Sequence, residues 1–245
     1  MTAVSVTGVV LDMDGLLIDT EPVWRVAERD VFAELGVELT QADLLDTTGM
    51  RIDELAAAFL PRRPPSADPP GADPSRPSPP GADPSRPSPA DPSPAEVAAR
   101  ITDLVVDYVR RAGEPMPGVP EAIALFERSG LRLAIASSSP ERLIDAVCAR
   151  LKLDIDIRCS ALDEPRGKPA PDVYLAAARR LRVSPARCLA LEDSPSGVVA
   201  AKDAGMTCVA VPDPLLAGDP RYRRADLVLP SLTELTEPLL RGLTT

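Results

Sequence analysis

The sequence of 245 residues contains no histidine. Without an imidazole the chain has no Ser-His-Asp or Cys-His catalysis, no HExxH zinc site and no histidine acid or base. Any enzyme built from this chain must therefore move protons with carboxylates. Lysine is almost as rare, because only Lys152, Lys168 and Lys202 stand among the 27 basic residues. A lysine beside other polar residues at the end of a strand is therefore informative.

Other missing features exclude further classes of protein. The formal net charge of −10 leaves no basic stripe, so we expect binding to neither nucleic acid nor an anionic membrane. No run approaches the roughly 20 apolar residues that a membrane span needs, and no secretory signal precedes the first apolar run. The four cysteines show no CxxC spacing. We therefore expect a cytoplasmic protein that is a monomer and binds a small ligand.

Six short apolar runs alternate with helix-like segments. The segments 140–151, 171–181 and 196–205 carry apolar residues every three or four positions, and Pro171 and Pro195 stand where a first helical turn tolerates proline. Continuous apolar strands separated by amphipathic helices predict an α/β fold with a parallel, Rossmann-like sheet that is covered on both faces. The expected strands are residues 5–11, 131–137, 155–160, 187–192, 207–212 and 225–230.

More than a hundred residues separate the first two expected strands, far more than one crossover needs. Helical patterns at 21–36, 51–60 and 94–113 occupy much of this interval. The sequence therefore predicts two units. The α/β core consists of residues 1–18 and 117–245, and an all-helical cap, residues 19–116, is inserted after the first strand.

A tandem repeat lies inside the predicted cap. The ten residues PPGADPSRPS occupy positions 69–78 and again positions 79–88, and the region 61–94 holds 14 of the 29 prolines. Such a region cannot bury enough apolar surface to offset its ordering entropy, so we expect a flexible loop with polyproline character. A duplication tolerated at a surface turn explains the repeat. The alternative is a PxxP docking site for a protein partner.

Two pairs of acids follow buried strands. Asp12 and Asp14 end the run VVLDMDG, and Glu192 and Asp193 end the run ALED. An acidic turn or a helix cap explains one such pair. However, side chains two apart on a strand point the same way, and ligands of open α/β sheets bind beyond the carboxyl ends of the strands. Carboxylates gathered there repel one another unless a cation binds, and their oxygens suit Mg²⁺.

Two further polar motifs also follow strands. Three serines, residues 137–139, come directly after LAIA, where they either cap the next helix or bind an anion through hydroxyl and backbone N–H groups. Lys168 stands in GKPAP, just ahead of a proline-started helix. A surface lysine is the ordinary interpretation, but a compact ammonium also fits a phosphate oxygen. Together the four motifs indicate one site for an anion and a metal ion.

In this order, the motifs DMDGLLIDTE, the serine after LAIA, GKPAP and LEDSPSG resemble those of the haloacid dehalogenase superfamily. The resemblance covers nearly the whole chain, including a helical cap inserted after the first motif. DMDGLLIDTEPVW and DPRYRRADLVLPSLTEL are most similar to the group of hexitol and 2-deoxyglucose-6-phosphate phosphatases, near β-phosphoglucomutase. The resemblance implies a Mg²⁺-dependent phosphoric monoester hydrolase for small sugar or polyol phosphates.

The resemblance also implies roles for the four acids. Asp12 attacks phosphorus and forms an aspartyl-phosphate, while Asp14 protonates the leaving alkoxide and later takes a proton from the attacking water. Asp12, the backbone carbonyl of Asp14, and Asp193 hold the metal. Glu192 is either a direct ligand or an outer partner of the metal site.

The resemblance also implies roles for the remaining motif residues and for two residues of the cap. Ser137, Ser138 and Lys168 are expected to bind the transferred phosphoryl group. Arg51 and Trp24 lie in cap segments that relatives place over the substrate. A solvated helix face for Arg51 and a packing role for Trp24 explain these two residues equally well.

Three functional classes are compatible with the sequence. The first is the phosphatase, and the second is a hexose-phosphate mutase of the β-phosphoglucomutase type. That mutase uses a cap-side histidine, which this chain lacks, and Trp24 lies in the corresponding region. The third class is a binding or scaffold protein that docks a partner through the repeat. A phosphonate hydrolase is disfavoured, because residues 19–116 contain no lysine for a Schiff base.

Overall fold

Six parallel strands form a single sheet in the order β3-β2-β1-β4-β5-β6. The computed structural model describes residues 6–64 and 92–244, so the proline-rich repeat lies outside the described residues. Leu11 in the central strand stands beside Ile135 of one neighbour and Leu191 of the other. The predicted parallel α/β fold is therefore confirmed. The strands are β1 (Gly8–Leu11), β2 (Arg132–Ser137), β3 (Ile157–Ser160), β4 (Cys188–Glu192), β5 (Thr207–Ala210) and β6 (Leu227–Val228).

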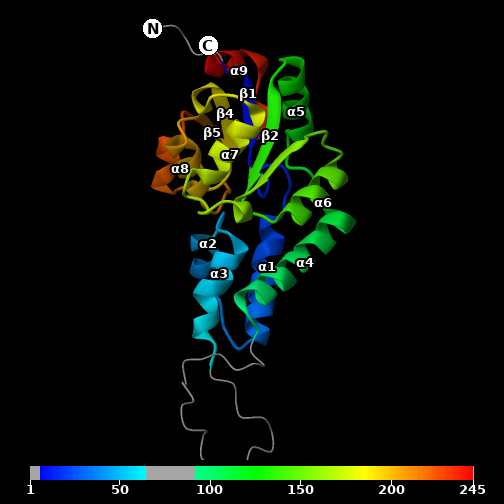
Figure 1. Cartoon of the computed structure of the whole chain (residues 1–245), viewed down its shortest axis with the longest axis vertical. Helices are drawn as coiled ribbons and strands as arrows, with labels where there is room; N and C mark the ends of the chain where they lie inside the picture. Colours follow the sequence, from blue (N-terminus) through cyan, green and yellow to red (C-terminus); the bar gives the residue numbers. More distant parts are fainter. Residues whose placement is uncertain (1–5, 65–91, 245) are drawn as a thin grey trace, which may run out of the picture.

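Helices cover both faces of this sheet (Figure 1). Alternate residues of β1 point to opposite faces: Val9 and Leu11 belong to one buried cluster and Val10 to another. The first cluster includes residues of α5 (Val119–Arg128), α6 (Glu141–Leu151) and α9 (Glu237–Thr244), and the second includes residues of α7 (Asp172–Leu181) and α8 (Pro195–Asp203). Strands buried on both sides explain why the sequence shows continuous apolar runs.

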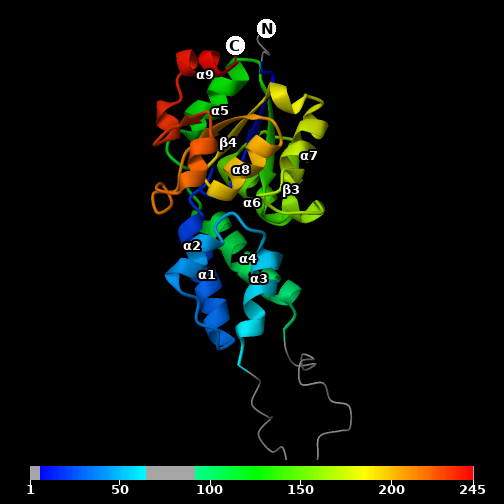
Figure 2. The same cartoon turned by 90° about the vertical axis from the view of Figure 1, so that its left-hand side faces the viewer.

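Four more helices lie together beyond the carboxyl edge of the sheet (Figures 1 and 2). They are α1 (Glu21–Glu34), α2 (Gln41–Asp46), α3 (Ile52–Phe59) and α4 (Pro94–Ala112). Phe32 and Phe59 pack edge to face with ring centroids 6.0 Å apart. An antiparallel bridge joins Ile18 to Pro115, so the chain enters and leaves this helical group at adjacent points. The boundaries 1–18, 19–116 and 117–245 stay a prediction, and these contacts favour them.

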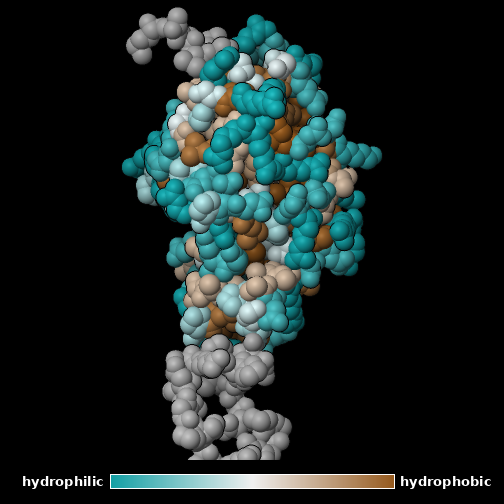
Figure 3. All heavy atoms as spheres, in the orientation of Figure 1, coloured by the Kyte–Doolittle hydropathy of each residue, from teal (hydrophilic) through white to brown (hydrophobic). Residues whose placement is uncertain are grey.

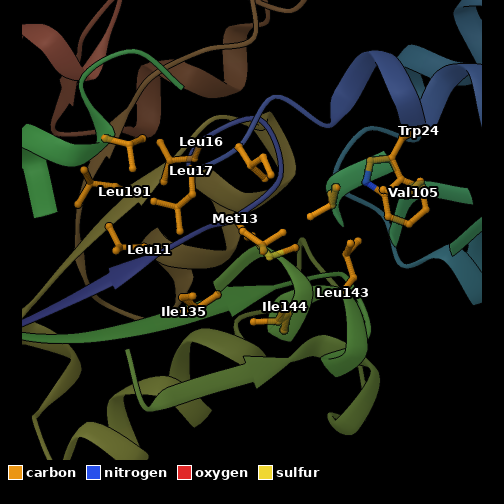
Figure 4. Packing of buried hydrophobic residues seen from close by; sticks show 14 of the residues in the cluster. Leu11, Met13, Leu16, Leu17, Trp24, Val105, Ile135, Leu143, Ile144 and Leu191 are labelled. Atoms are coloured by element: carbon orange, nitrogen blue, oxygen red, sulfur yellow. The ribbon is translucent and has the colours of Figure 1, made fainter. Parts of the chain in front are cut away.

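One apolar cluster connects the sheet to the helical group. Leu11 and Ile135 of the sheet belong to the same buried cluster as Trp24 of α1 and Val105 of α4 (Figure 4). Helix α4 also packs against α6 of the core. Hydrophilic residues predominate on the outer face drawn in Figure 3. Apolar packing therefore holds α1 and α4 over the end of the sheet, where the polar motifs lie.

Three helices, α2, α5 and α9, were not predicted from the sequence. Helix α2 buries none of its six residues, so it has no apolar stripe, although Thr40 and Asp43 form a capping box. Helix α5 follows Gly118, whose φ of +88° marks a turn, and its second residue is Pro120. A glycine and a proline so close together are typical of a loop, so the sequence of this segment did not indicate a helix. The other expected helices are present, with Pro195 in the first turn of α8 and α7 beginning directly after Pro171.

No helix of the described part of the chain is long and apolar enough to cross a membrane. The four cysteines are buried and none of them forms a disulfide. The expected cytoplasmic location and the monomeric state stay predictions.

Candidate functional site

Asp12 lies at the carboxyl end of the central strand. Its backbone N–H donates to the carbonyl of Leu191 in β4 at 3.0 Å, which continues the pairing of the two strands. The strand order reverses between β1 and β4, and open α/β sheets bind ligands at such a crevice. Glu192 and Asp193 end β4 on the other side of this crevice. The fold therefore brings the two predicted acidic pairs together.

Lys168 joins the two acidic pairs. Its Nζ donates to Asp12 Oδ1 at 2.5 Å and to Glu192 Oε1 at 2.6 Å, and its side chain is 1% exposed. Burial on its own would lower the pKa of this lysine, but Asp12 and Glu192 outweigh burial and raise it. The ammonium is therefore permanently charged and fixed beside Asp12. The scarcity of lysine drew attention to this residue in the sequence, and phosphate binding by Lys168 stays a prediction.

Glu192 is surrounded by donors. Besides Lys168, the hydroxyl of Tyr174 donates to Oε1 at 2.7 Å, and Ser194 donates to Oε2 from its N–H at 2.9 Å and from its hydroxyl at 3.0 Å. Ser194 also caps α8 by accepting from the N–H of Gly197. These bonds occupy both carboxylate oxygens. Glu192 therefore positions Lys168, and the contacts favour the outer-partner alternative for its role at the metal site.

Gly197 makes this arrangement possible, which yields a prediction. A Cβ at this position would lie 1.7 Å from Oε1 of Glu192, whose bonds prevent it from moving away. We expect Gly197→Ala to lower the free energy of unfolding by about 1 to 3 kcal/mol, and to lower the melting temperature by roughly 2 to 4 °C per kcal/mol. Gly218→Ala is the control, because a Cβ there meets nothing within 4 Å. Equal melting temperatures would show that the Glu192 carboxylate is not held rigidly.

Three buried carboxylates can offer oxygens to one ion. One oxygen each of Asp12, Glu192 and Asp193 lie within 4.8 Å of one another. Oδ2 of Asp193 is buried and accepts no hydrogen bond from the described residues. The chain also keeps space beside this oxygen, because a Cβ on Gly15 would lie 2.1 Å from it. An acceptor buried without a donor is costly, so the residues fit a bound cation.

The electrostatics of the three buried carboxylates also favour a bound cation. Burial, followed by repulsion from Glu192, raises the pKa of Asp12 to about 7 despite the opposing charge of Lys168. Burial and the charge of Asp12 also raise the pKa of Asp193 well above its ordinary value. The single positive charge of Lys168 does not balance the negative charge of these carboxylates. A divalent cation would neutralise them and is the natural partner of such a site.

Asp14 is held by donors from both the sheet and the helical group. Its Oδ1 accepts from the hydroxyl of Thr20 at 2.6 Å and from Nε1 of Trp24 at 2.9 Å. Its Oδ2 accepts from the hydroxyl of Ser139 at 2.7 Å and from that of Ser137 at 3.4 Å. Both oxygens of the Asp14 carboxylate therefore accept hydrogen bonds, one from the core and one from the cap side, and its part in proton transfer and metal binding stays a prediction. The sequence did not single out Thr20, and it gave Ser139 no role beyond its place in the serine motif.

The three serines of the motif lie in different positions. Ser138 and Ser139 line the cavity, and the hydroxyl of Ser138 donates to the carbonyl of Gly49 at 2.7 Å. Ser137 lies fully buried behind them, where its hydroxyl accepts from the N–H of Ser139 at 3.0 Å. Phosphate binding by Ser137 and Ser138 stays a prediction. The contacts show in addition that the motif ties the sheet edge to the segment before α3.

A cavity lies between the sheet edge and the helical group. Helix α1 and the segment 44–52 form its far wall. Trp24 is part of this wall and its Nε1 donates to Asp14, while substrate binding by Trp24 stays a prediction. Three charged residues of α1 in the wall were not predicted, and only their three- and four-residue spacing on one helix face could have indicated them: Glu21, Arg25 and Glu28.

Arg51 lies outside the lining of this cavity. Its Nη1 donates to the carbonyls of Ala161 and Glu164 in the core, at 3.2 and 3.1 Å. Its other nitrogens bind Asp53 at 2.5 and 3.0 Å. Substrate binding by Arg51 stays a prediction, and the contacts favour a role in holding the cap against the core.

With this geometry in place, the chain can be compared with known proteins. A model of the haloacid dehalogenase-like hydrolase family matches residues 6–205. Hexitol phosphatase B of Escherichia coli strain K12 is 39% identical over 236 residues, covering 95% of this chain and 96% of that protein. Protein CbbY of Cereibacter sphaeroides is 32% identical and covers 94% of each chain.

Solved structures give the same picture of the fold. A CbbY mutant from Rhodobacter sphaeroides in complex with xylulose-1,5-bisphosphate has a TM-score of 0.78 at 28% identity, over 98% of this chain and all of that one. A β-phosphoglucomutase from Clostridium difficile has a TM-score of 0.76 at 18% identity, over 98% of this chain and 97% of that one, which shows the shared fold alone.

Proposed function

The chain belongs to the haloacid dehalogenase-like hydrolase family, and on this premise we propose that it is a Mg²⁺-dependent phosphatase for small sugar or polyol phosphates. One observation carries the proposal. The Asp12 carboxylate is bound to Lys168 and lies beside the unpartnered oxygen of Asp193, at the floor of a cavity. This combination offers a nucleophile, a fixed positive charge and a place for a cation within one site.

Hydrolysis would proceed in two displacements. Lys168 occupies Oδ1 of Asp12, which leaves Oδ2, an oxygen without a hydrogen bond from any described residue, to attack phosphorus. The bond from phosphorus to the alcohol oxygen breaks, and Asp14 gives its proton to the departing alkoxide. Water then attacks phosphorus of the aspartyl-phosphate and passes a proton to Asp14. Phosphate leaves, and Asp12 and Asp14 return to their starting states.

The remaining residues act by position and charge. Asp12, Asp193 and the backbone carbonyl of Asp14 would hold the metal, with Glu192 as an outer partner through Lys168. When bound, Mg²⁺ would neutralise charge on the phosphoryl group and on its carboxylate ligands. Lys168, Ser138 and the N–H groups of the serine loop would contact the phosphoryl oxygens, where fixed donors stabilise developing charge best.

Hydrolysis is favoured over mutase transfer by the relatives and by the residues present. The hexitol phosphatase covers nearly all of this chain at 39% identity. The chain has no histidine for the cap-side position that the mutase uses, and Trp24 of α1 instead bonds Asp14. The scaffold alternative depends on the repeat, which lies outside the described residues.

The test is phosphate release from a panel of sugar and polyol phosphates. We expect release with Mg²⁺, and EDTA to lower the rate by at least about 100-fold, because the carboxylate cluster repels a phosphate dianion. Added Mg²⁺ should restore the rate. Undiminished release in EDTA would remove the metal from the proposal. Absence of release, with transfer of phosphate between hexose positions, would establish the mutase instead.

A further inference from the structure

The far wall of the cavity carries charged groups that the hydrolytic reaction does not use. Glu21, Trp24, Arg25 and Glu28 all belong to α1 and all line the cavity. Their spacing of three and four residues places them on one face of the helix. This face lies opposite Asp12 and Lys168, which are on the core side of the same cavity. It is therefore the surface that the alcohol part of a bound ester would meet.

Two polar groups of this face lack partners. Glu28 lines the cavity with 8% of the residue exposed, and its carboxyl accepts no hydrogen bond from a residue within 6–64 or 92–244. Nε of Arg25 is buried without a partner as well, although Nη2 of the same residue binds Asp213 and Glu21. Buried polar groups are normally paired. An acceptor and a donor left open three residues apart therefore point to a ligand.

The chemistry of that ligand follows from the two open groups. A hydroxyl both donates and accepts a hydrogen bond, so it can satisfy Glu28 and Arg25 together. Burial, followed by the nearby charge of Glu21, raises the pKa of Glu28 to about 8. A carboxyl that keeps its proton can donate a hydrogen bond as well as accept one. A carbon chain bearing several hydroxyls matches such a wall.

The cavity wall formed by α1 does not suit a substrate that carries a second phosphate group. The lining contains five carboxyl groups and two cationic side chains. Both cations are already bound, because Lys168 pairs with Asp12 and Glu192, and Arg25 pairs with Asp213. Arg51, the other cation near the cap edge, lies outside the lining and binds core carbonyls. Within the described part of the wall, a distal phosphate dianion would find carboxyl groups and no uncommitted cation.

From this arrangement we infer that Glu28, with Arg25, binds hydroxyl groups of the alcohol part of the substrate and determines specificity. The substrate class is a phosphate monoester of an uncharged, hydroxyl-rich alcohol, and bisphosphates are rejected. The inference rests on the proposed phosphatase function and narrows its substrate.

The first test compares sorbitol 6-phosphate with n-butyl phosphate, which has no hydroxyl groups. The wild type should prefer sorbitol 6-phosphate by about tenfold or more in kcat/KM. Glu28→Ala should lose about tenfold on sorbitol 6-phosphate, mainly through KM, and should keep its rate on n-butyl phosphate. Glu28→Gln should retain most of the preference, because an amide also donates and accepts. Asp30→Asn, an exposed acid on the same helix, is the control.

The second test compares fructose 6-phosphate with fructose 1,6-bisphosphate. The wild type should hydrolyse the bisphosphate at least about tenfold less efficiently, because the wall offers its second phosphate carboxyl groups but no uncommitted cation. Equal efficiencies would overturn the inference, as would an unchanged preference for sorbitol 6-phosphate in Glu28→Ala.

These outcomes are separable from failure of the proposed function. If the wild type releases phosphate from neither sorbitol 6-phosphate nor n-butyl phosphate with Mg²⁺, the phosphatase proposal fails and the inference fails with it. If it hydrolyses both equally well, and Glu28→Ala changes neither rate, the phosphatase stands and only the role of Glu28 is wrong. If Glu28→Ala does not fold, Glu28→Met decides, because it keeps the size of the side chain and removes both carboxyl oxygens. A loss on sorbitol 6-phosphate alone supports hydroxyl recognition, and a loss equal on both esters, or no loss, contradicts it.

Discussion

Replacing Asp12 with asparagine is expected to abolish phosphate release from every ester. The amide keeps the size of the side chain but is not a nucleophile toward phosphorus, and Asp12 is the one carboxylate of the described cavity lining that Lys168 bonds. Loss of the nucleophile should lower kcat by on the order of 10⁴-fold or more. The measurement is phosphate release at saturating ester with Mg²⁺, at enzyme concentrations high enough to detect such a residual rate.

The same variant should not be less stable in EDTA. Asp12, Glu192 and Asp193 are three buried carboxylates around one ammonium, so removal of one negative charge relieves repulsion while Lys168 keeps its bond to Glu192. We therefore expect the thermal midpoint of Asp12→Asn in EDTA to equal or exceed that of the wild type. This result separates lost chemistry from lost folding. A stable variant with a retained rate would exclude the covalent route.

Three acids of the proposed reacting centre could be picked out from the sequence because each follows an apolar run. Asp12, Asp14 and Asp193 follow β1 and β4, and parallel strands bring their carboxyl ends to one edge. Lys168 was identifiable because lysine is scarce. These signals are local in the sequence, and a parallel sheet converts them into one site without further information.

The wall that faces the reacting centre could not be predicted in the same way. Glu28 and Arg25 belong to an ordinary amphipathic helix, and a charged residue on such a helix usually faces solvent. Only the placement of α1 over the sheet, through a cluster shared by Trp24, Val105 and Leu11, turns these side chains inward. The bonds that Thr20 and Ser139 donate to Asp14 could not be foreseen for the same reason, because the two residues approach it from different elements.

Asp14→Ala is expected to lower turnover of alkyl phosphates by about 10² to 10⁴-fold, the range of a positioned acid or base. The carboxylate lies among the donors Thr20, Trp24 and Ser139, which hold it at the cavity wall and are themselves too weakly acidic to replace it. The fold should be retained, because Asp14 is only partly buried and the hydroxyl donors can bind water instead. Circular dichroism and a thermal melt check this point.

The leaving group shows what Asp14 does. An alkoxide needs a proton as it departs, whereas nitrophenolate leaves without one, so Asp14→Ala should still transfer phosphate from p-nitrophenyl phosphate to Asp12. Hydrolysis of the aspartyl-phosphate should then be slow, because no base takes the proton of water. Rapid mixing should therefore reveal a burst of about one nitrophenolate per active site followed by slow turnover. An equal loss on both esters without a burst would place Asp14 outside proton transfer, and full activity would remove it from the mechanism.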